Sequence, residues 1–230
     1  MNGLRSCFFY IILLLSLFTA AEGREKIQNS IVFNGSIHPI PAPILEQMLH
    51  STWHPDCPVA IQDLAYLELD HWGFDHRIHT GALIVNRQLA TEVVEIFKIL
   101  FEHHFLIERM ELIENFQGND LLSMEANNTS AFNCRDVFGE PGVFSQHSYG
   151  RAIDINPLIN PFVYGHEITP QQGAFYANRS QPSPGKIVKN DIVYRTFAQF
   201  GWDWAGEWYD VQDYQHFEKR ENGEKRNPYG

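Results

Sequence analysis

Two short segments of the chain carry the residue types best suited to catalysis. Residues 145–154 have the form S-x-H-x-x-G-x-A-x-D, and residues 213–218 have the form D-x-x-H-F-E. Together they offer two imidazoles and one carboxylate, from His147, His216 and Asp154. Two imidazoles and a carboxylate are a typical donor set of catalytic Zn2+, with the fourth position left to water. The two segments therefore predict a Zn2+ site, provided that the fold brings them together.

Two further carboxylates flank the second histidine, and either can serve as acid and base in a hydrolytic reaction. Such a group takes a proton from water and passes it to the leaving amine. Asp213 lies three residues before His216, so a local turn is needed to bring the two side chains to one side. Glu218 lies two residues after His216 and shares its face in a strand. Spacing leaves two assignments open: Asp213 as the base, or Glu218 as the base with Asp213 as a structural acceptor.

The first segment must also bend if its ligands are to meet. Alternation in residues 151–156 predicts a strand that presents Asp154 on the face opposite Ile153 and Ile155. His147 lies seven residues before Asp154, an odd number that would place the two on opposite faces of a flat strand. Gly150 lies between them and permits a turn before the strand. The metal hypothesis requires this turn.

Other histidines compete for the same interpretation, because the chain has eleven. His71, His76 and His79 form a second cluster, which we interpret as turn or core histidines rather than ligands. His103 and His104 lie at the end of a predicted helix, where an imidazole interacts favourably with the helix dipole.

The first 21 residues are typical of a secretory signal peptide. Arg5 precedes an apolar run at 7–18, and small residues follow at 19–21. The apolar run is too short to cross a bilayer comfortably, although an uncleaved anchor is the alternative. We therefore expect an exported protein, periplasmic or extracellular, without stable membrane insertion after signal cleavage. Residues 22–230 are expected to form a single domain, which carries the proposed Zn2+ site.

The composition limits the kinds of partner that this domain is expected to bind. The formal net charge is −11 and no basic patch is present, which disfavours a nucleic-acid partner. Two cysteines remain after the leader, Cys57 and Cys134. An exported compartment permits a disulfide between them, and two buried free thiols are the alternative. The sequence leaves the oligomeric state open.

The predicted elements indicate an α+β domain with a small, mainly antiparallel sheet flanked by helices. Apolar periodicity predicts helices at 41–53, 87–104 and 190–200. Short apolar or alternating runs predict strands at 64–69, 81–85, 106–113 and 151–156. Between them we expect a polar aromatic turn at 71–79, a long surface loop at 117–133 and a functional flap at 165–185.

The two motifs in combination resemble those of the VanY-like zinc D-Ala-D-Ala carboxypeptidases and of L-alanyl-D-glutamate endopeptidases. The likeness extends to residues 201–208, G-W-D-W-A-G-E-W, which resemble a Gly-Trp-x-Trp-Gly-Gly-x-Trp segment ahead of the last ligand in some members. It also includes residues 73–75 with 79–81, and residues 128–135. The resemblance implies a fold of the Hedgehog/DD-peptidase type.

The resemblance also assigns roles. It implies that the metal ligands are His147, Asp154 and His216 and that Asp213 is the catalytic base, as in the endopeptidase branch. Members use an arginine to steady the substrate carbonyl. Arg135 is the best candidate here, with a surface salt bridge as its alternative. Residues assigned to substrate binding are Ser130, Ser145 and Trp204, although buried tryptophans ahead of a strand are more often core.

These observations predict an exported zinc metallopeptidase that hydrolyses an amide bond in a peptidoglycan stem peptide. The bond is either the terminal D-Ala-D-Ala bond or one inside the stem, as between L-Ala and D-Glu. The competing hypothesis is a non-catalytic module of the same fold that keeps its metal and binds cell-wall peptide or another protein.

Overall fold

The computed structural model describes residues 31–226. The leader predicted at 1–21 lies outside the described residues. None of the helices in the described range combines the length and the apolar character that a bilayer crossing needs.

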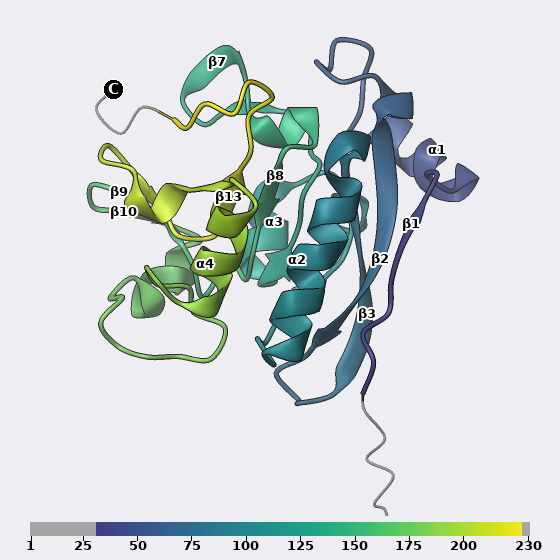
Figure 1. The fold of residues 1–230 in the computed structure, drawn as a ribbon. Coiled ribbons are helices and arrows are strands. Elements are labelled where there is room, and N and C mark those ends of the chain that lie inside the picture. The colour runs from purple at the N-terminus through teal and green to yellow at the C-terminus, as the bar shows by residue number, and fades with distance from the viewer. Residues whose placement is uncertain (1–30, 227–230) are drawn as a thin grey trace, which may run out of the picture. The chain divides into compact units, whose positions relative to one another are not determined.

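A three-stranded antiparallel sheet and two helices form the first half of the domain (Figure 1). Its strands are β1 (Gly35–His38), β2 (Leu64–Trp72) and β3 (Ile78–Asn86), in the order β1-β2-β3. Successive side chains of β2 point to opposite faces of the sheet, so its apolar side chains pack in two different cores. Ala65, Leu67 and Leu69 pack in the core that includes helix α2 (Ala90–Glu102), whereas Leu64 packs with Met48 of helix α1 (Ala42–His50). The helices predicted at 41–53 and 87–104 are thereby confirmed, with shorter bounds.

The hairpin of β2 and β3 is longer than the sequence indicates, so the turn predicted at 71–79 is confirmed only for residues 73–77. The strands continue to the pair Trp72 and Ile78, and only residues 73–77 lie between them. The aromatic residues that we assigned to a turn stabilise the strand ends instead. Trp72 stacks on His104, with ring centroids 4.6 Å apart.

A second antiparallel sheet carries two of the three predicted ligands. Its strands are β11 (Asp203–Trp204), β13 (His216–Glu218) and β8 (Ala152–Asp154), in the order β11-β13-β8. Ile153 and Phe217 are paired in the register and both lie in the core. Phe217 stacks on Phe197 of helix α4 (Ile192–Gln199), with centroids 4.0 Å apart. The strand predicted at 151–156 and the helix predicted at 190–200 are confirmed, again with shorter bounds.

In a third small sheet, a strand from the second motif and a strand from the predicted flap pair with the two edges of the same central strand. Strands β9 (Phe162–Tyr164), β10 (Glu167–Thr169) and β12 (Gln212–Asp213) pair in the order β10-β9-β12. The flap predicted at 165–185 is therefore not structureless, because it contains β10 and a 3₁₀ helix at Gln171–Tyr176. A half-buried arginine, Arg179, donates to backbone carbonyls on both sides of this region, those of Ile159 and Ile187.

The surface loop predicted at 117–133 is wrong, because its second half is buried. The segment contains helix α3 (Asp120–Glu125) and strand β5 (Asn128–Thr129), which pairs in parallel with β4 (Arg109–Met110). Of the strand predicted at 106–113, only the two residues of β4 form a strand. Asparagine side chains satisfy buried backbone groups: Asn128 donates to the carbonyl of Glu111, and Asn127 accepts from the amide of Leu158. An asparagine-rich sequence therefore lies inside the protein.

The turn that the metal hypothesis requires is present at Gly150. The hairpin of β6 (Asp136–Val137) and β7 (Glu140–Phe144) leads into a 3₁₀ helix at Gln146–Tyr149. Gly150 ends this helix with φ 66°, in the left-handed region that favours glycine. A Cβ atom at Gly150 would lie 2.6 Å from the backbone nitrogen of Asn86, so the position also requires the smallest side chain.

Replacing this glycine should be far more damaging than replacing another left-handed glycine. Gly139, with φ 79°, has nothing within 4 Å of an added Cβ, so Gly139→Ala should lower the free energy of unfolding only by about 1–2 kcal/mol. Gly150→Ala should lose about 1–3 kcal/mol more, from overpacking. Urea denaturation of both variants measures the difference, and equal losses would contradict the tight turn.

Candidate metal centre

Three side chains from distant parts of the chain converge on one buried point. Their ligand atoms, in His147, Asp154 and His216, all lie within 4.8 Å of one another. Nε2 of His147 is 3.1 Å from Oδ2 of Asp154, and Nδ1 of His216 is 2.9 Å from Oδ1 of the same carboxylate. The two ring nitrogens are 3.1 Å apart. This is the set of side chains that the sequence singled out.

Each side chain reaches this point through a different local structure. His147 sits in the 3₁₀ helix whose first turn is capped by Ser145, the hydroxyl of which accepts from the amide of His147. Asp154 ends β8 and His216 begins β13, directly opposite it in the register. Since Ile153 and Phe217 face the core, Asp154 and His216 share the other face of the pair.

A backbone carbonyl fixes the orientation of the first imidazole. Nδ1 of His147 is hydrogen-bonded to the carbonyl oxygen of Ala131. A carbonyl can only accept, so Nδ1 carries a proton, and Nε2 is the nitrogen that faces Asp154. Metal-binding histidines generally have a second-nitrogen partner of this kind, which sets the tautomer and the direction of the ring.

A carboxylate plays the same part for the second imidazole. Nε2 of His216 lies 3.3 Å from Oε2 of Glu218, and the other oxygen of Glu218 accepts from Nε of Arg220 at 2.7 Å. Both oxygens of Glu218 are therefore engaged, on the side of the ring away from Asp154. This leaves Nδ1 of His216 as the nitrogen available to a cation.

Each ionisable group of the cluster changes the pKa of its neighbours. Burial raises the pKa of Asp154, but His147 and His216 outweigh this effect and hold that pKa well below its usual range. Burial likewise disfavours the charged form of His216, yet its hydrogen bonds to Asp154 and Glu218 prevail and raise its pKa to about 10. A cation must displace the proton of His216, since ligands bind metal in their deprotonated forms. Two nitrogen lone pairs and a buried carboxylate fit Zn2+.

Asp213 differs from the other acidic residues near the cluster because one of its oxygens is unused. Its Oδ1 is buried and has no hydrogen-bond partner within residues 31–226. Burial raises the pKa of Asp213 to about 6, with a further rise from the negative charge of Asp154. A carboxylate with a free oxygen and a pKa near neutrality is suited to proton transfer. Glu218, held by His216 and Arg220, is not free in this way.

The remaining predicted residues lie around the cluster without forming it. Ser130 exchanges two backbone hydrogen bonds with Asp154. The guanidinium of Arg135 pairs with Asp120 at 2.9 Å, and Trp204 packs in the main core with Nε1 donating to the carbonyl of Tyr214. The sequence pattern at residues 201–208 gave no reason to prefer Trp208 over Trp204. In the structure, Trp208 packs edge-on against His216, with ring centroids 5.6 Å apart.

Sequence reasoning missed the orienting partners of the two histidines. The carbonyl of Ala131 has no sequence signal, because every residue has one. Glu218 had a signal in its spacing from His216, but spacing did not distinguish an orienting carboxylate from a base. Arg220 lies two residues further along and could have been noted as the partner of Glu218.

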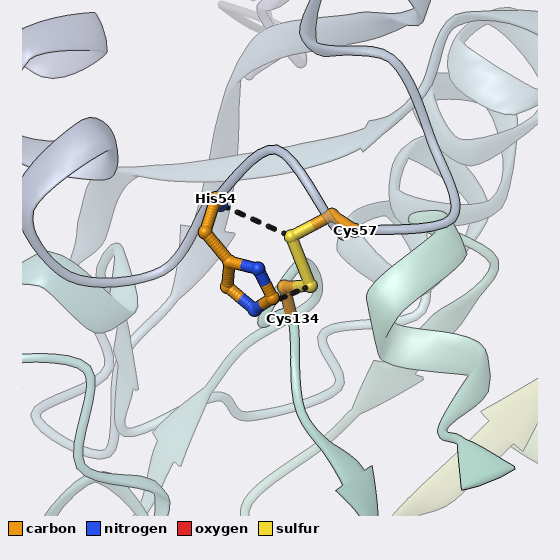
Figure 2. A group of neighbouring side chains, drawn as sticks. All are labelled: His54, Cys57 and Cys134. Carbon is orange, nitrogen blue, oxygen red and sulfur yellow. Dashed lines mark hydrogen bonds between the residues drawn. A yellow bond between two sulfur atoms is a disulfide. The ribbon is translucent and has the colours of Figure 1, made fainter. Parts of the chain in front are cut away.

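A second group of possible ligands consists of His54, Cys57 and Cys134, with ligand atoms also within 4.8 Å of one another (Figure 2). The two sulfur atoms are joined in a disulfide. A disulfide offers no thiolate, and thiolate is the form of cysteine that binds metal. The cluster of His71, His76 and His79 forms no such group in the described range; burial lowers the pKa of His71 to about 4, and His79 pairs with Asp75.

Comparison with known protein families identifies the segment that contains the cluster. Residues 139–219 match the model of a family described as D-alanyl-D-alanine carboxypeptidase. This match confirms the resemblance seen in the motifs and covers His147, Asp154, Asp213 and His216. No curated protein and no solved structure matches the chain.

Removal of either imidazole should abolish metal binding. Wild-type protein dialysed against Zn2+ and then against metal-free buffer should retain one equivalent, and His147→Ala and His216→Ala should retain none, because each variant removes one of three ligands. His79→Ala, which changes an exposed histidine outside the cluster, is the control. Mass spectrometry of the metal content gives the readout. A full equivalent of Zn2+ on both cluster variants would place the metal elsewhere.

Glu218 should behave as an orienting residue. Glu218→Ala should weaken Zn2+ affinity about 10–100-fold, the usual effect of losing a partner of a metal ligand. Glu218→Gln should retain most of the affinity, since an amide oxygen still accepts from Nε2 of His216. Glu221→Ala, at an exposed neighbour, controls for lost surface charge. Competition with a chromogenic chelator measures the affinities, and equal affinity for the wild type and Glu218→Ala would rule out this role.

Proposed function

We propose that this chain, which carries the D-alanyl-D-alanine carboxypeptidase family match over residues 139–219, is a zinc metallopeptidase acting on peptidoglycan stem peptides. One observation carries the proposal. A buried His-Asp-His cluster with metal-ligand spacing lies close enough to Asp213 for their charges to interact, and one oxygen of Asp213 has no hydrogen-bond partner in the described part of the chain. A metal-binding protein without hydrolytic activity has no need of that second feature.

In this proposal the residues divide the work of hydrolysis. His147, Asp154 and His216 would hold Zn2+, which would supply a Lewis acid that polarises the amide carbonyl and makes water more acidic. Asp213 takes the proton of the attacking water as the new C–O bond forms. The same group then gives this proton to the amine as the C–N bond breaks. Glu218 acts through His216 and does not touch the substrate.

The environment of Asp213 supports this role. With a pKa raised to about 6 by burial, Asp213 is mostly ionised at neutral pH and can accept a proton. Its conjugate acid is weaker than an ordinary aspartic acid, so the carboxylate is a better base than an exposed aspartate would be.

We further propose that the fold is of the Hedgehog/DD-peptidase type and that residues 22–230 work as one exported domain, in the periplasm or outside the cell. The mixed α+β architecture with small antiparallel sheets is consistent with that fold type. The signal-peptide pattern in the first 21 residues supports export, and the Cys57–Cys134 disulfide is of the kind that persists in oxidising compartments. Arg135 would contribute to substrate binding only by exchanging Asp120 for the substrate.

Incubation with synthetic stem peptides tests the proposal and identifies the bond. The Zn2+-loaded wild type should release either terminal D-alanine or a fragment cut within the stem, as read by mass spectrometry. Asp213→Ala should keep its Zn2+ and lose about 10²–10⁴-fold in rate, the usual contribution of a general base. Asp210→Ala, at an exposed aspartate that pairs with Arg226, should stay active.

Two outcomes would contradict the proposal. Full activity in Zn2+-free protein would exclude the mechanism. Binding of stem peptide by Zn2+-loaded protein without any cleavage would favour the non-catalytic module instead.

A further inference from the structure

A single segment, residues 130–135, contacts two of the three candidate ligands. Ser130 and Asp154 each donate a backbone N–H to the other's carbonyl, at 3.0 and 2.9 Å. The next residue, Ala131, holds Nδ1 of His147 through its carbonyl oxygen. The backbone N–H of Asn133 donates to the carbonyl of His147, at 3.3 Å. The position of this segment therefore bears directly on how His147 and Asp154 meet.

The end of the same segment holds the 3₁₀ helix that carries His147. The amide of Arg135 donates to Oγ of Ser148 at 2.8 Å, and that hydroxyl donates to the carbonyl of Arg135 at 2.7 Å. The amide of Ser145 also donates to the carbonyl of Arg135, at 3.0 Å. Hydrogen bonds therefore link Arg135 to Ser145, which precedes His147, and to Ser148, which follows it.

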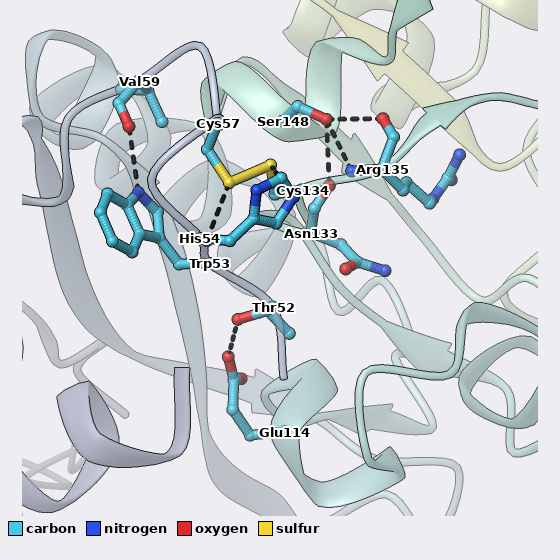
Figure 3. The surroundings of a disulfide bond; sticks show 10 residues. All are labelled: Thr52, Trp53, His54, Cys57, Val59, Glu114, Asn133, Cys134, Arg135 and Ser148. Atoms are coloured by element: carbon cyan, nitrogen blue, oxygen red, sulfur yellow. Dashed lines mark hydrogen bonds between the residues drawn. A yellow bond between two sulfur atoms is a disulfide. The ribbon is translucent and has the colours of Figure 1, made fainter. Parts of the chain in front are cut away.

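The outer side of the segment is anchored at residue 134. The amide of Cys134 donates to the carbonyl of Thr52 at 3.0 Å, and its sulfur is bonded to Cys57, which is 77 residues away in sequence (Figure 3). Cys134 lies between Asn133 and Arg135, the two residues whose backbone supports the 3₁₀ helix. Figure 3 shows Ser148 hydrogen-bonded to Asn133 and Arg135, close to the disulfide at Cys134.

We infer that the Cys57–Cys134 disulfide is a positioning element of the metal centre, and that its reduction lowers the affinity of the centre for Zn2+. Reduction by a dithiol or phosphine adds two electrons and two protons and yields two thiols. Without the cross-link, residues 133–135 lose their covalent anchor to the 52–57 segment. The hydrogen bonds to His147, Ser148 and Ser145 then fix the helix less tightly, and the ligands are held less well in the geometry that binds the cation.

The inference rests on the proposed Zn2+ site, and it predicts more than a loss of stability. Any cross-link that closes a long loop stabilises a folded domain. A purely stabilising disulfide would leave the Zn2+ affinity of the folded molecule unchanged. A positioning disulfide changes that affinity under conditions in which the protein remains folded.

The experiment compares Zn2+ affinity in three proteins, by competition with a chromogenic chelator. These are the oxidised wild type, the Cys57→Ser/Cys134→Ser variant, and Met48→Ala. Met48 packs in the same small core as Cys134 without contacting the metal ligands through hydrogen bonds, so its truncation controls for lost stability. Affinity should fall about 10–100-fold in the double serine variant and stay at the wild-type value in Met48→Ala.

Reduction of the folded wild type with a phosphine gives the same comparison if the serine variant does not fold. Affinity should fall on reduction and return on reoxidation. Amide exchange adds a readout that needs no metal: the amides of Ser145 and Asn133 should exchange faster after reduction. Failure of the oxidised wild type to bind Zn2+ would overturn the proposed function, whereas unchanged Zn2+ affinity after reduction of the folded protein would overturn this inference, whatever the exchange rates.

Discussion

The pairing of His216 with Asp154 across β13 and β8 is the constraint on which the rest of the structure depends. Residues opposed in an antiparallel pair place their side chains on the same face, so this register brings imidazole and carboxylate within 2.9 Å. A slip by one residue would turn Asp154 toward the core and Ile153 away from it. Burial of Ile153 and Phe217 and assembly of the candidate centre are therefore two results of one pairing.

The surroundings of the centre follow from the need to compensate buried charge. Unpaired ionisable groups are unfavourable in the protein interior, and this cluster gives each imidazole a second partner, the carbonyl of Ala131 or the carboxylate of Glu218. Against this background Asp213 is the one carboxylate within residues 31–226 that has a buried oxygen without a hydrogen-bond partner. An exception to hydrogen-bond satisfaction beside a metal-binding cluster is the feature that most favours catalysis over simple metal binding.

Sequence patterns predicted what depends on local spacing. The alternation in residues 151–156, the turn at Gly150 and the three longer helices all follow from neighbouring residues. The patterns could not predict features that depend on distant partners. Residues 117–133 appeared exposed because asparagines are polar, yet Asn127 and Asn128 are buried by bonding backbone groups elsewhere in the chain. Likewise, nothing local distinguishes the free carboxylate of Asp213 from one already held by an arginine.

X-ray absorption at the zinc K-edge of Zn2+-loaded protein tests the central claim most directly, because it reports the atoms bound to the metal. The structure predicts a first shell of light atoms only, with two imidazole nitrogens at about 2.0–2.1 Å and a carboxylate oxygen at about 2.0–2.2 Å. Multiple scattering should show two imidazoles. A sulfur scatterer at about 2.3 Å, or a shell with no imidazole, would contradict the account.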